Sequence, residues 1–231
     1  MDESINPKES GYGAHEVVIE TQKHNVGWYE FSKKDFFDSF GVAKKRALVL
    51  SRQKGIKYVM LFKNHGRLGG ASLVHSHMQI LASKFLPALI LGEEEHMKKK
   101  GCLFCNMVKH ENPVVYENKN FLVISPYWAS YPFEMWVVAK KHYLNLFSQK
   151  DSVLMDFSSS VQNLIQRVKK KLGKIPFNFL FHYYPKSEKG GHFHAEFAPR
   201  VKFEASVELG FGIKVNSVSP GRAYRILTGK V

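Results

Sequence analysis

The fold is inferred first from the segment Asn64-His65-Gly66-Arg67-Leu68-Gly69-Gly70-Ala71-Ser72-Leu73-Val74-His75-Ser76-His77-Met78-Gln79-Ile80-Leu81. Its glycines predict a turn that leads into a β-strand. Side chains two residues apart on a strand point to the same face, so His75, His77 and Gln79 are expected to share one. A polar face toward solvent is one interpretation, because antiparallel sheets often have a solvated face. Two imidazoles and an amide behind a glycine turn favour a functional site.

The composition limits the class of protein. The chain has 231 residues, enough for one large domain or two small ones. Its 34 Lys and Arg residues against 20 Asp and Glu residues give a formal net charge of +14, which indicates an anionic partner such as a nucleotide, a phosphorylated metabolite, nucleic acid or an acidic membrane surface. No apolar run is long enough to span a membrane, and no apolar signal segment is found near Met1. We therefore expect a soluble, cytoplasmic protein.

Two long amphipathic helices are predicted, each followed by a strand. The first has Ser32 as its N-cap and extends to Gly55, and the second runs from about Asp151 to Leu172 before Gly173. A connecting helix with a Glu and Lys block is expected within residues 83–100. Further strands are predicted at 15–21, 57–63, 114–117, 120–125, 133–139, 177–183 and 192–197.

The order of these parts repeats. A Lys-His pair, a helix, a strand, a Gly-Gly turn and a His-x-His strand occur twice. His24 precedes His75 by 51 residues (75 − 24), and His142 precedes His192 by 50 (192 − 142). Two fused modules of one architecture explain this order.

The repeat predicts an α+β fold in which each module has an antiparallel sheet with one main helix. The modules are expected at residues 1–84 and 101–231, joined by a connector at 85–100, with both sheets merging into a larger one. The cysteines of the second module precede His142, and their counterparts in the first module would fall before Met1. The first module is therefore expected to be incomplete at its N-terminus.

The only two cysteines form a Cys-x-x-Cys motif, Cys102 and Cys105. With His142 and a histidine of the 192/194 pair they make a plausible closed zinc site, because zinc prefers four tetrahedral thiolate and imidazole ligands. We favour His192 as the fourth ligand and keep His194 as the alternative. A redox role is disfavoured because the motif is not expected to open a helix that would stabilise a thiolate. Whether His24 and His75 bind a metal without cysteines stays open.

His77 is the candidate nucleophile. A neutral imidazole can attack phosphorus and form a phosphoramidate, which splits a nucleotidyl transfer into two displacements. One ring nitrogen must then be free while a hydrogen bond to the other fixes the tautomer. Gln79 can donate an amide hydrogen to a phosphate oxygen. Ser72 and the backbone of residues 69–71 can hold phosphate oxygens where charge shifts during the reaction.

Taken together, these residues resemble the active-site signature of the galactose-1-phosphate uridylyltransferase family, in which two modules of the histidine-triad superfamily are fused. The matching motif is Asn64-x-Gly66…Gly70-Ala71-Ser72-x-x-His75-x-His77-x-Gln79. Supporting segments are His15–Thr21 with His24, Pro126–Glu134, His192–Arg200 and Glu208–Gly210. The resemblance covers nearly the whole chain.

The resemblance implies specific roles. His77 would carry the nucleotidyl group, and Gln79, Asn64, Ser72 and the loop residue Gly70 would contact the phosphates. In relatives that keep it, the second-module metal corresponds to Cys102, Cys105, His142 and His192. A Lys-Phe pair that reaches a partner subunit's sugar nucleotide would be Lys202-Phe203, and family members are commonly homodimers.

Three functions remain open at this stage. The first is a nucleotidyltransferase that exchanges a nucleotidyl group between a sugar nucleotide and a sugar phosphate. The second is a phosphorylase or hydrolase of an ADP-sugar or a dinucleoside polyphosphate, although Gln79 argues against pure hydrolysis because hydrolytic relatives generally have His there. The third is a non-catalytic nucleotide- or RNA-binding module, supported by the +14 charge but by no RNA-binding aromatic motif. The resemblance places the base- and ribose-binding residues in a stretch that we expect to be missing before Met1, so the base and the sugar stay undetermined.

Overall fold

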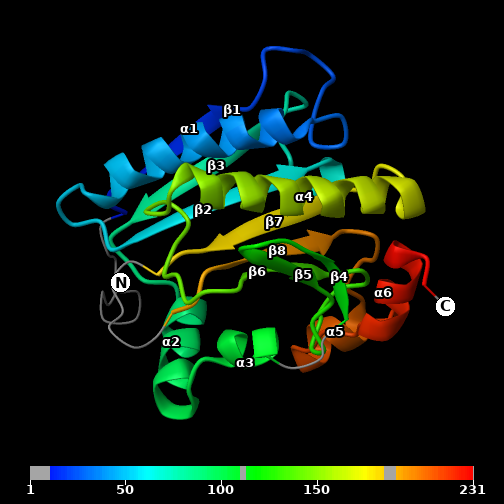
Figure 1. Cartoon of the computed structure of the whole chain (residues 1–231). Coiled ribbons are helices and arrows are strands. Elements are labelled where there is room, and N and C mark those ends of the chain that lie inside the picture. Colours follow the sequence, from blue (N-terminus) through cyan, green and yellow to red (C-terminus); the bar gives the residue numbers. More distant parts are fainter. Residues whose placement is uncertain (1–10, 110–112, 185–190, 231) are drawn as a thin grey trace, which may run out of the picture.

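One antiparallel sheet of eight strands carries the fold (Figure 1). The structure is a computed structural model that describes residues 11–109, 113–184 and 191–230. Across the sheet the strands follow the order β1-β3-β2-β7-β8-β6-β5-β4. Their bounds are β1 Gly13–Ile19, β2 Tyr58–His65, β3 His77–Ser83, β4 Val114–Glu117, β5 Phe121–Ile124, β6 Met135–Ala139, β7 Phe177–His182 and β8 His194–Pro199.

Two long helices cover one face of the sheet, α1 (Lys33–Ser51) and α4 (Asp151–Leu172). Figure 1 shows them side by side over the strands. The N-terminus of α1 is a capping box: Asp35 N–H donates to Ser32 Oγ (3.2 Å), and Ser32 N–H donates to Asp35 Oδ2 (2.7 Å). At the end of α4 the chain turns at Gly173, whose φ of 79° favours glycine.

The buried side chains of α1 and α4 interleave with those of the sheet and form the core. Phe40 of α1 and Phe157 of α4 lie 5.2 Å apart between ring centroids, and Phe157 also contacts Phe181 of β7 at 5.6 Å. β2 pairs with β7, with Phe62 opposite Leu180 and His65 opposite Phe177. The strands of residues 13–83 and those of residues 114–199 therefore share one sheet and one core.

The remaining helices lie mostly beside the half of the sheet that contains β4–β8. Their bounds are α2 Ala88–Lys100, α3 Leu103–Lys109, α5 Ser206–Phe211 and α6 Pro220–Thr228, together with a short 3₁₀ helix, η1, at Arg67–Gly69. In Figure 1, α2 and α3 lie on the side of the sheet opposite to α1 and α4. Ile90 and Met97 of α2 and Phe104 of α3 are buried there. On the same side of the other half, Val17, Ile19 and Leu81 are exposed.

The structure confirms the predicted α+β fold: an antiparallel sheet, with one main helix accompanying each half. Two details of the prediction were wrong. The Cys-x-x-Cys motif does open a helix, since α3 begins at Leu103, between the two cysteines. His75 and His192 precede β3 and β8 instead of lying within them, and their rings bond to Thr21 O and Ala139 O. Gly190 of the second glycine turn lies outside the described residues.

In the described part of the chain, no helix is long and apolar enough to cross a membrane.

Candidate active site

The loop between β2 and β3 brings the backbone close to β7. Gly66 and Gly70 flank η1 with φ values of 73° and 76°, a backbone region that glycine adopts without strain. A Cβ atom on Gly69 would lie 2.7 Å from the carbonyl oxygen of Phe177. The glycines therefore allow both the tight turn and the close approach that place the loop beside His77.

His77 begins β3 and is 3% exposed. Its Nδ1 lies 2.8 Å from the carbonyl oxygen of His75. A carbonyl only accepts hydrogen bonds, so Nδ1 carries the hydrogen and Nε2 keeps its lone pair in the neutral ring. The protein thus fixes the tautomer that a nucleophilic imidazole requires.

Gln79 lies on the same face of β3, two residues after His77. Its Oε1 accepts a hydrogen bond from His15 Nε2 of β1 (2.9 Å), and the His15 ring stacks on Phe62 of β2 with 6.4 Å between centroids. Because Oε1 is occupied by His15, the amide nitrogen of Gln79 is left to donate. This is the orientation that the predicted phosphate contact needs.

Two of the predicted substrate-binding residues line one pocket with His77. Asn64 and Ser72 border a pocket of about 440 Å³ that also includes Lys63 and His75. Asn64 Oδ1 accepts a hydrogen bond from Asn178 Nδ2 of β7 (2.7 Å), which leaves the amide nitrogen of Asn64 as a donor. Amide, hydroxyl and imidazole groups therefore converge at one place, where phosphate oxygens could be held.

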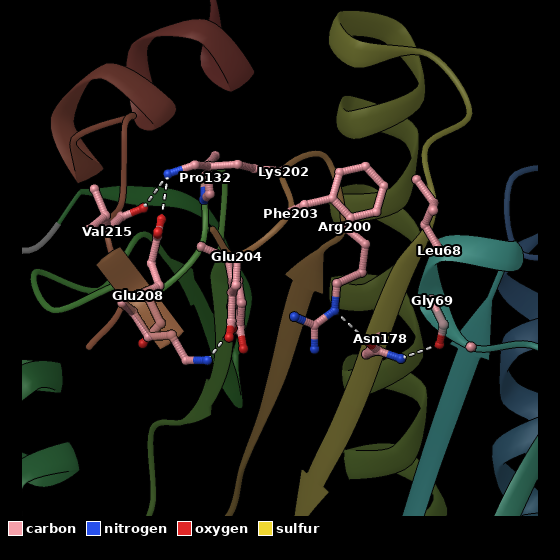
Figure 2. A pocket seen from close by; sticks show the side chains of 14 residues that line it. Leu68, Gly69, Pro132, Asn178, Arg200, Lys202, Phe203, Glu204, Glu208 and Val215 are labelled. Atoms are coloured by element: carbon pink, nitrogen blue, oxygen red, sulfur yellow. Dashed lines mark hydrogen bonds and ion pairs between the residues drawn. The ribbon is translucent and has the colours of Figure 1, made fainter. Parts of the chain in front are cut away.

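A second pocket, of about 430 Å³, contains the other predicted binding residues, Gly70, Lys202 and Phe203 (Figure 2). Lys202 Nζ donates to Glu208 Oε1 (2.8 Å) and to Val215 O (3.4 Å), and Phe203 is 72% exposed. Arg200 crosses the pocket, with its Nε bonded to Asn178 Oδ1 (2.5 Å) and its guanidinium 4.3 Å from the centre of the Tyr131 ring. Since Asn178 also bonds Asn64 and Gly69 O, it links the two pockets.

The four predicted metal ligands come together. The donor atoms of Cys102, Cys105, His142 and His192 lie within 4.8 Å of one another. His192 Nδ1 is 3.3 Å from Cys102 Sγ and 3.5 Å from Cys105 Sγ, and His142 Nδ1 is 3.4 Å from Cys105 Sγ. Sulfur and nitrogen ligands on a tetrahedral zinc ion are separated by roughly 3.5 Å. The arrangement therefore fits a closed zinc site.

The hydrogen bonds also decide between the two histidines. His192 Nε2 bonds to Ala139 O (2.7 Å), which leaves Nδ1 facing the thiols, whereas His194 Nδ1 bonds to His192 O (3.0 Å). His192 therefore belongs with the cysteines and His194 does not. In the other half, the rings of His24 and His75 are arranged like those of His142 and His192, with 5.1 Å and 5.0 Å between centroids. Among the described residues, however, His24 and His75 do not belong to any cluster of three or more potential metal ligands.

A second group that could hold a metal was not anticipated from the sequence. The donor atoms of Glu93, His182 and His194 lie within 4.8 Å of one another, and His194 Nε2 is buried without a hydrogen-bond partner among the described residues. Burial opposes a charge on His182, but hydrogen bonds to Glu196 and Glu93 raise its pKa to about 10. Because a histidine must lose that proton before it can bind a metal, the group as it stands is a His182 imidazolium held between Glu93 and Glu196.

Glu93 and His182 could not be assigned to a site from the sequence because α2 and β7 meet only in the folded chain. The same holds for Lys63 of β2 and Glu20, which form a buried ion pair beside His77. One feature of the sequence points to the ion pair: Lys63 lies in an apolar strand, and a Lys that is buried needs a partner.

Comparison with known proteins gives two family matches. The C-terminal domain of galactose-1-phosphate uridyl transferase matches residues 57–211, and the N-terminal domain of DUF4931, a domain of unknown function, matches residues 12–86. The first of these covers more than half of the chain.

Individual relatives cover almost all of the chain. ADP-glucose phosphorylase from Arabidopsis thaliana is 27% identical over 94% of this chain, which spans 64% of that enzyme's length. Galactose-1-phosphate uridylyltransferase from Thermotoga maritima is 30% identical over 95% of this chain and 75% of its own length. The crystal structure of an Arabidopsis thaliana ADP-glucose phosphorylase with bound ADP-glucose superimposes with a TM-score of 0.90 at 25% identity, covering 100% of this chain and 78% of that one.

Proposed function

The chain belongs to the galactose-1-phosphate uridyl transferase family, and we propose that it transfers a nucleotidyl group from a sugar nucleotide to a sugar phosphate through a covalent intermediate on His77. The observation that supports this most strongly is the state of His77: its Nδ1 hydrogen is bound to His75 O, and its Nε2 lone pair is free. Family membership supports the nucleotidyl group as the part transferred.

The proposed reaction has two displacements. Nε2 of His77 attacks the α-phosphorus of the sugar nucleotide, an N–P bond forms, and the P–O bond to the departing sugar 1-phosphate breaks. The ring becomes positively charged, and the Nδ1–H bond to His75 O stabilises that charge. A phosphate oxygen of the acceptor then attacks the same phosphorus, the N–P bond breaks, and His77 returns to its neutral form. Asn64, Ser72 and Gln79 would donate hydrogen bonds to the phosphate oxygens.

Phosphorolysis of an ADP-sugar is the second candidate, with inorganic phosphate as the acceptor. The similarity to ADP-glucose phosphorylase in sequence and in structure favours it. Both candidates share the first displacement and differ in the base and in the acceptor. The pocket with Arg200 suits either acceptor, because within the described residues no carboxylate pairs with that guanidinium, whereas Lys202 pairs with Glu208 and Lys214 with Glu204.

Intact-mass measurement tests the proposal. The protein is incubated with UDP-glucose or ADP-glucose, and we expect an acid-labile, base-stable nucleotidyl adduct that is absent from His77→Ala. His194→Asn, which changes the equivalent histidine of the other half, is the matched control and should keep the adduct. Adding galactose 1-phosphate or inorganic phosphate to the isolated adduct identifies the acceptor from the product released. A wild-type protein that forms no adduct with either nucleotide would contradict the proposal.

For the cysteine site we propose zinc, which would hold the start of α3, the segment before β8 and the His142 loop together. Metal analysis should find about one zinc ion per chain at this site. Cys102→Ser is expected to lose that zinc and to melt at a lower temperature. His24→Ala, at the position equivalent to His142, should retain it. A Cys102→Ser protein with unchanged zinc content and melting temperature would overturn the assignment.

A further inference from the structure

A buried ion pair lies directly beside the nucleophile. Lys63 Nζ of β2 is 2.5 Å from Oε2 of Glu20, the residue after β1, and the two side chains are 2% and 0% exposed. Lys63 also lines the pocket that contains His77, Asn64 and Ser72. The ammonium group of Lys63 and the carboxylate of Glu20 are thus both removed from water next to the proposed phosphate site.

Every strong polar group of this pair has a partner. Glu20 Oε1 accepts from Trp28 Nε1 (2.6 Å), and its Oε2 accepts from Ser76 Oγ (2.6 Å) as well as from Lys63. The ammonium group of Lys63 has three hydrogens, and it donates to Glu20, to Ser76 Oγ (3.1 Å) and to the carbonyl oxygen of His77 (2.9 Å). The network ends on the backbone of the nucleophile itself.

The other half of the molecule shows which residues can occupy the positions of Glu20 and Lys63 when no ion pair is present. Strand pairing places Ile19 opposite His77 and Val138 opposite His194, so Ala139 is the counterpart of Glu20. In the same way, Phe62 opposite Gln79 and Leu180 opposite Glu196 make Phe181 the counterpart of Lys63.

Ser76 and Phe193 both precede the second histidine of their motif. The three counterparts, Ala139, Phe181 and Phe193, are apolar and at most 2% exposed. Yet His194 Nδ1 still bonds to His192 O, as His77 Nδ1 bonds to His75 O. An apolar core therefore supports the same histidine geometry, and the ionic network is not required for it.

Replacing a buried ion pair by apolar side chains of similar volume is often neutral or stabilising, because the desolvation of the charges offsets their attraction. Stability therefore does not explain the ion pair of Lys63 and Glu20. The pair occurs only in the half that contains the proposed nucleophile and phosphate pocket. We infer that Lys63 is a positioning residue for the nucleotidyl transfer, holding a fixed positive charge against the His77 carbonyl beneath the phosphates, and that Glu20 keeps this lysine charged.

This inference rests on the proposed function of His77. A fixed charge that is already oriented before the reaction lowers the cost of the charge that develops in the transition state. The expected effect therefore falls on the rate of adduct formation and not on the binding of the nucleotide. A purely structural network would instead affect stability.

The main test is the neutral pair Glu20→Gln/Lys63→Met. Gln keeps an acceptor for Trp28, and Met fills the volume of the lysine chain. We expect a folded protein whose melting temperature is close to or above that of the wild type. The maximal rate of adduct formation should fall about tenfold or more at an unchanged KM for the sugar nucleotide. Lys44→Met is the matched control, because it removes another ion pair, with Asp151, far along the chain from His77, and should leave the rate unchanged.

The pH profile provides a second, independent test that holds even if the double variant does not fold. In Glu20→Gln the buried Lys63 loses the carboxylate that keeps it charged, so the rate should acquire a decline at alkaline pH that the wild type lacks. A neutral-pair protein that forms the adduct at the wild-type rate, or a Glu20→Gln protein with a wild-type pH profile, would overturn the inference. Absence of an adduct in the wild type would instead contradict the proposed function.

Discussion

At the scale of single residues, the two halves show why His77 is suited to nucleotidyl transfer and its counterpart His194 is not. His77 and His194 make the same Nδ1 contact with the preceding histidine carbonyl. The Phe104 ring of α3 stacks on His194 at 4.1 Å between centroids, and Glu196 stands where the first half has Gln79. A carboxylate beside the ring would repel phosphate oxygens, whereas an amide can donate to them. The second half has therefore kept the geometry but not an accessible, phosphate-compatible site.

His65 provides a pH prediction at the same scale. Burial lowers its pKa to about 4, and the nearby charges of Lys63 and Lys174 lower it further. The carboxylates of Glu20 and Glu30 oppose this shift. The neutral ring stacks on Phe177 at 4.8 Å. A folded-state pKa below the ordinary 6.5 means that the unfolded chain binds more protons between these values. The stability that His65 contributes is thus present above pH 6.5 and is lost as the pH falls toward 4.

Urea unfolding at several pH values measures this effect. The free energy of unfolding of the wild type should decline between pH 6.5 and 4 more steeply than that of His65→Gln, whose amide does not titrate. His96→Gln, at an exposed position of α2, is the control and should follow the wild-type curve. Parallel curves for the wild type and His65→Gln would show that the buried imidazole does not set the pH dependence.

At the scale of secondary-structure elements, the sequence predicts what a strong pattern specifies. The predicted bounds of α4 agree with the structure because its apolar stripe recurs at helical spacing and Gly173 ends it. Helices α5 and α6 were not predicted: α5 has six residues with only Glu208 buried, and α6 is fixed by contacts with α4. Helix α3 was not predicted because the Cys-x-x-Cys spacing indicates metal binding. The seven residues after Cys102 nevertheless form a helix.

The residues of the candidate site also form two groups: those that a sequence motif identifies, and those that only the fold brings together. His77, Gln79 and the proposed metal ligands Cys102, Cys105 and His142 lie in or near recognisable motifs, so their residue types suggest their chemistry. Lys63, Glu20, His15 and the Glu93–His182 pair acquire meaning only through strand register and helix docking. Which residues stand opposite one another in the β1–β3 and β2–β7 pairs depends on pairing between strands that lie far apart in the sequence.

The cap of α1 gives a prediction for an element. Ser32 accepts from Asp35 N–H, and removing such a cap costs about 1 kcal/mol of stability. We expect Ser32→Ala to lower the free energy of unfolding by that amount in chemical denaturation. The first residue before α4, Lys150, makes no side-chain cap bond, so Lys150→Ala is the matched control and should change little. Equal losses in the two variants would contradict the assignment of the cap.

At the scale of the whole molecule, the shared core implies that both halves unfold together. The β2–β7 pairing joins the sheet, and Lys44 of α1 donates to Gln149 O (2.5 Å) at the start of α4. Trp28, next to the first helix, packs on Phe177 and Phe179 of the other half at 5.6 Å and 5.1 Å. An internal repeat does not by itself require two independent folding units, and here each half buries its aromatic side chains against the other.

Phe157 tests this coupling because it contacts α1, β5, β7 and the residue before β8 at once. It is fully buried, and its ring centroid lies 5.2 Å from Phe40, 5.4 Å from Phe121 and 5.6 Å from Phe193. Phe157→Ala should cost about 3–5 kcal/mol, because it leaves a cavity that the surrounding rings can fill only in part. Two probes follow unfolding in urea: formation of the proposed adduct at His77 for one half, and loss of the proposed zinc ion for the other.

Both probes should shift to lower urea by the same amount, since a single cooperative transition exposes both sites. Tyr127→Ala, at a position that is 86% exposed, is the control and should leave both midpoints in place. If only the metal probe shifted, the half that contains α4 would unfold by itself, and the nucleotidyl site would not depend on it. Coincident shifts would mean that the proposed zinc site, although remote from His77 in sequence, helps to keep the nucleophile in place through the common core.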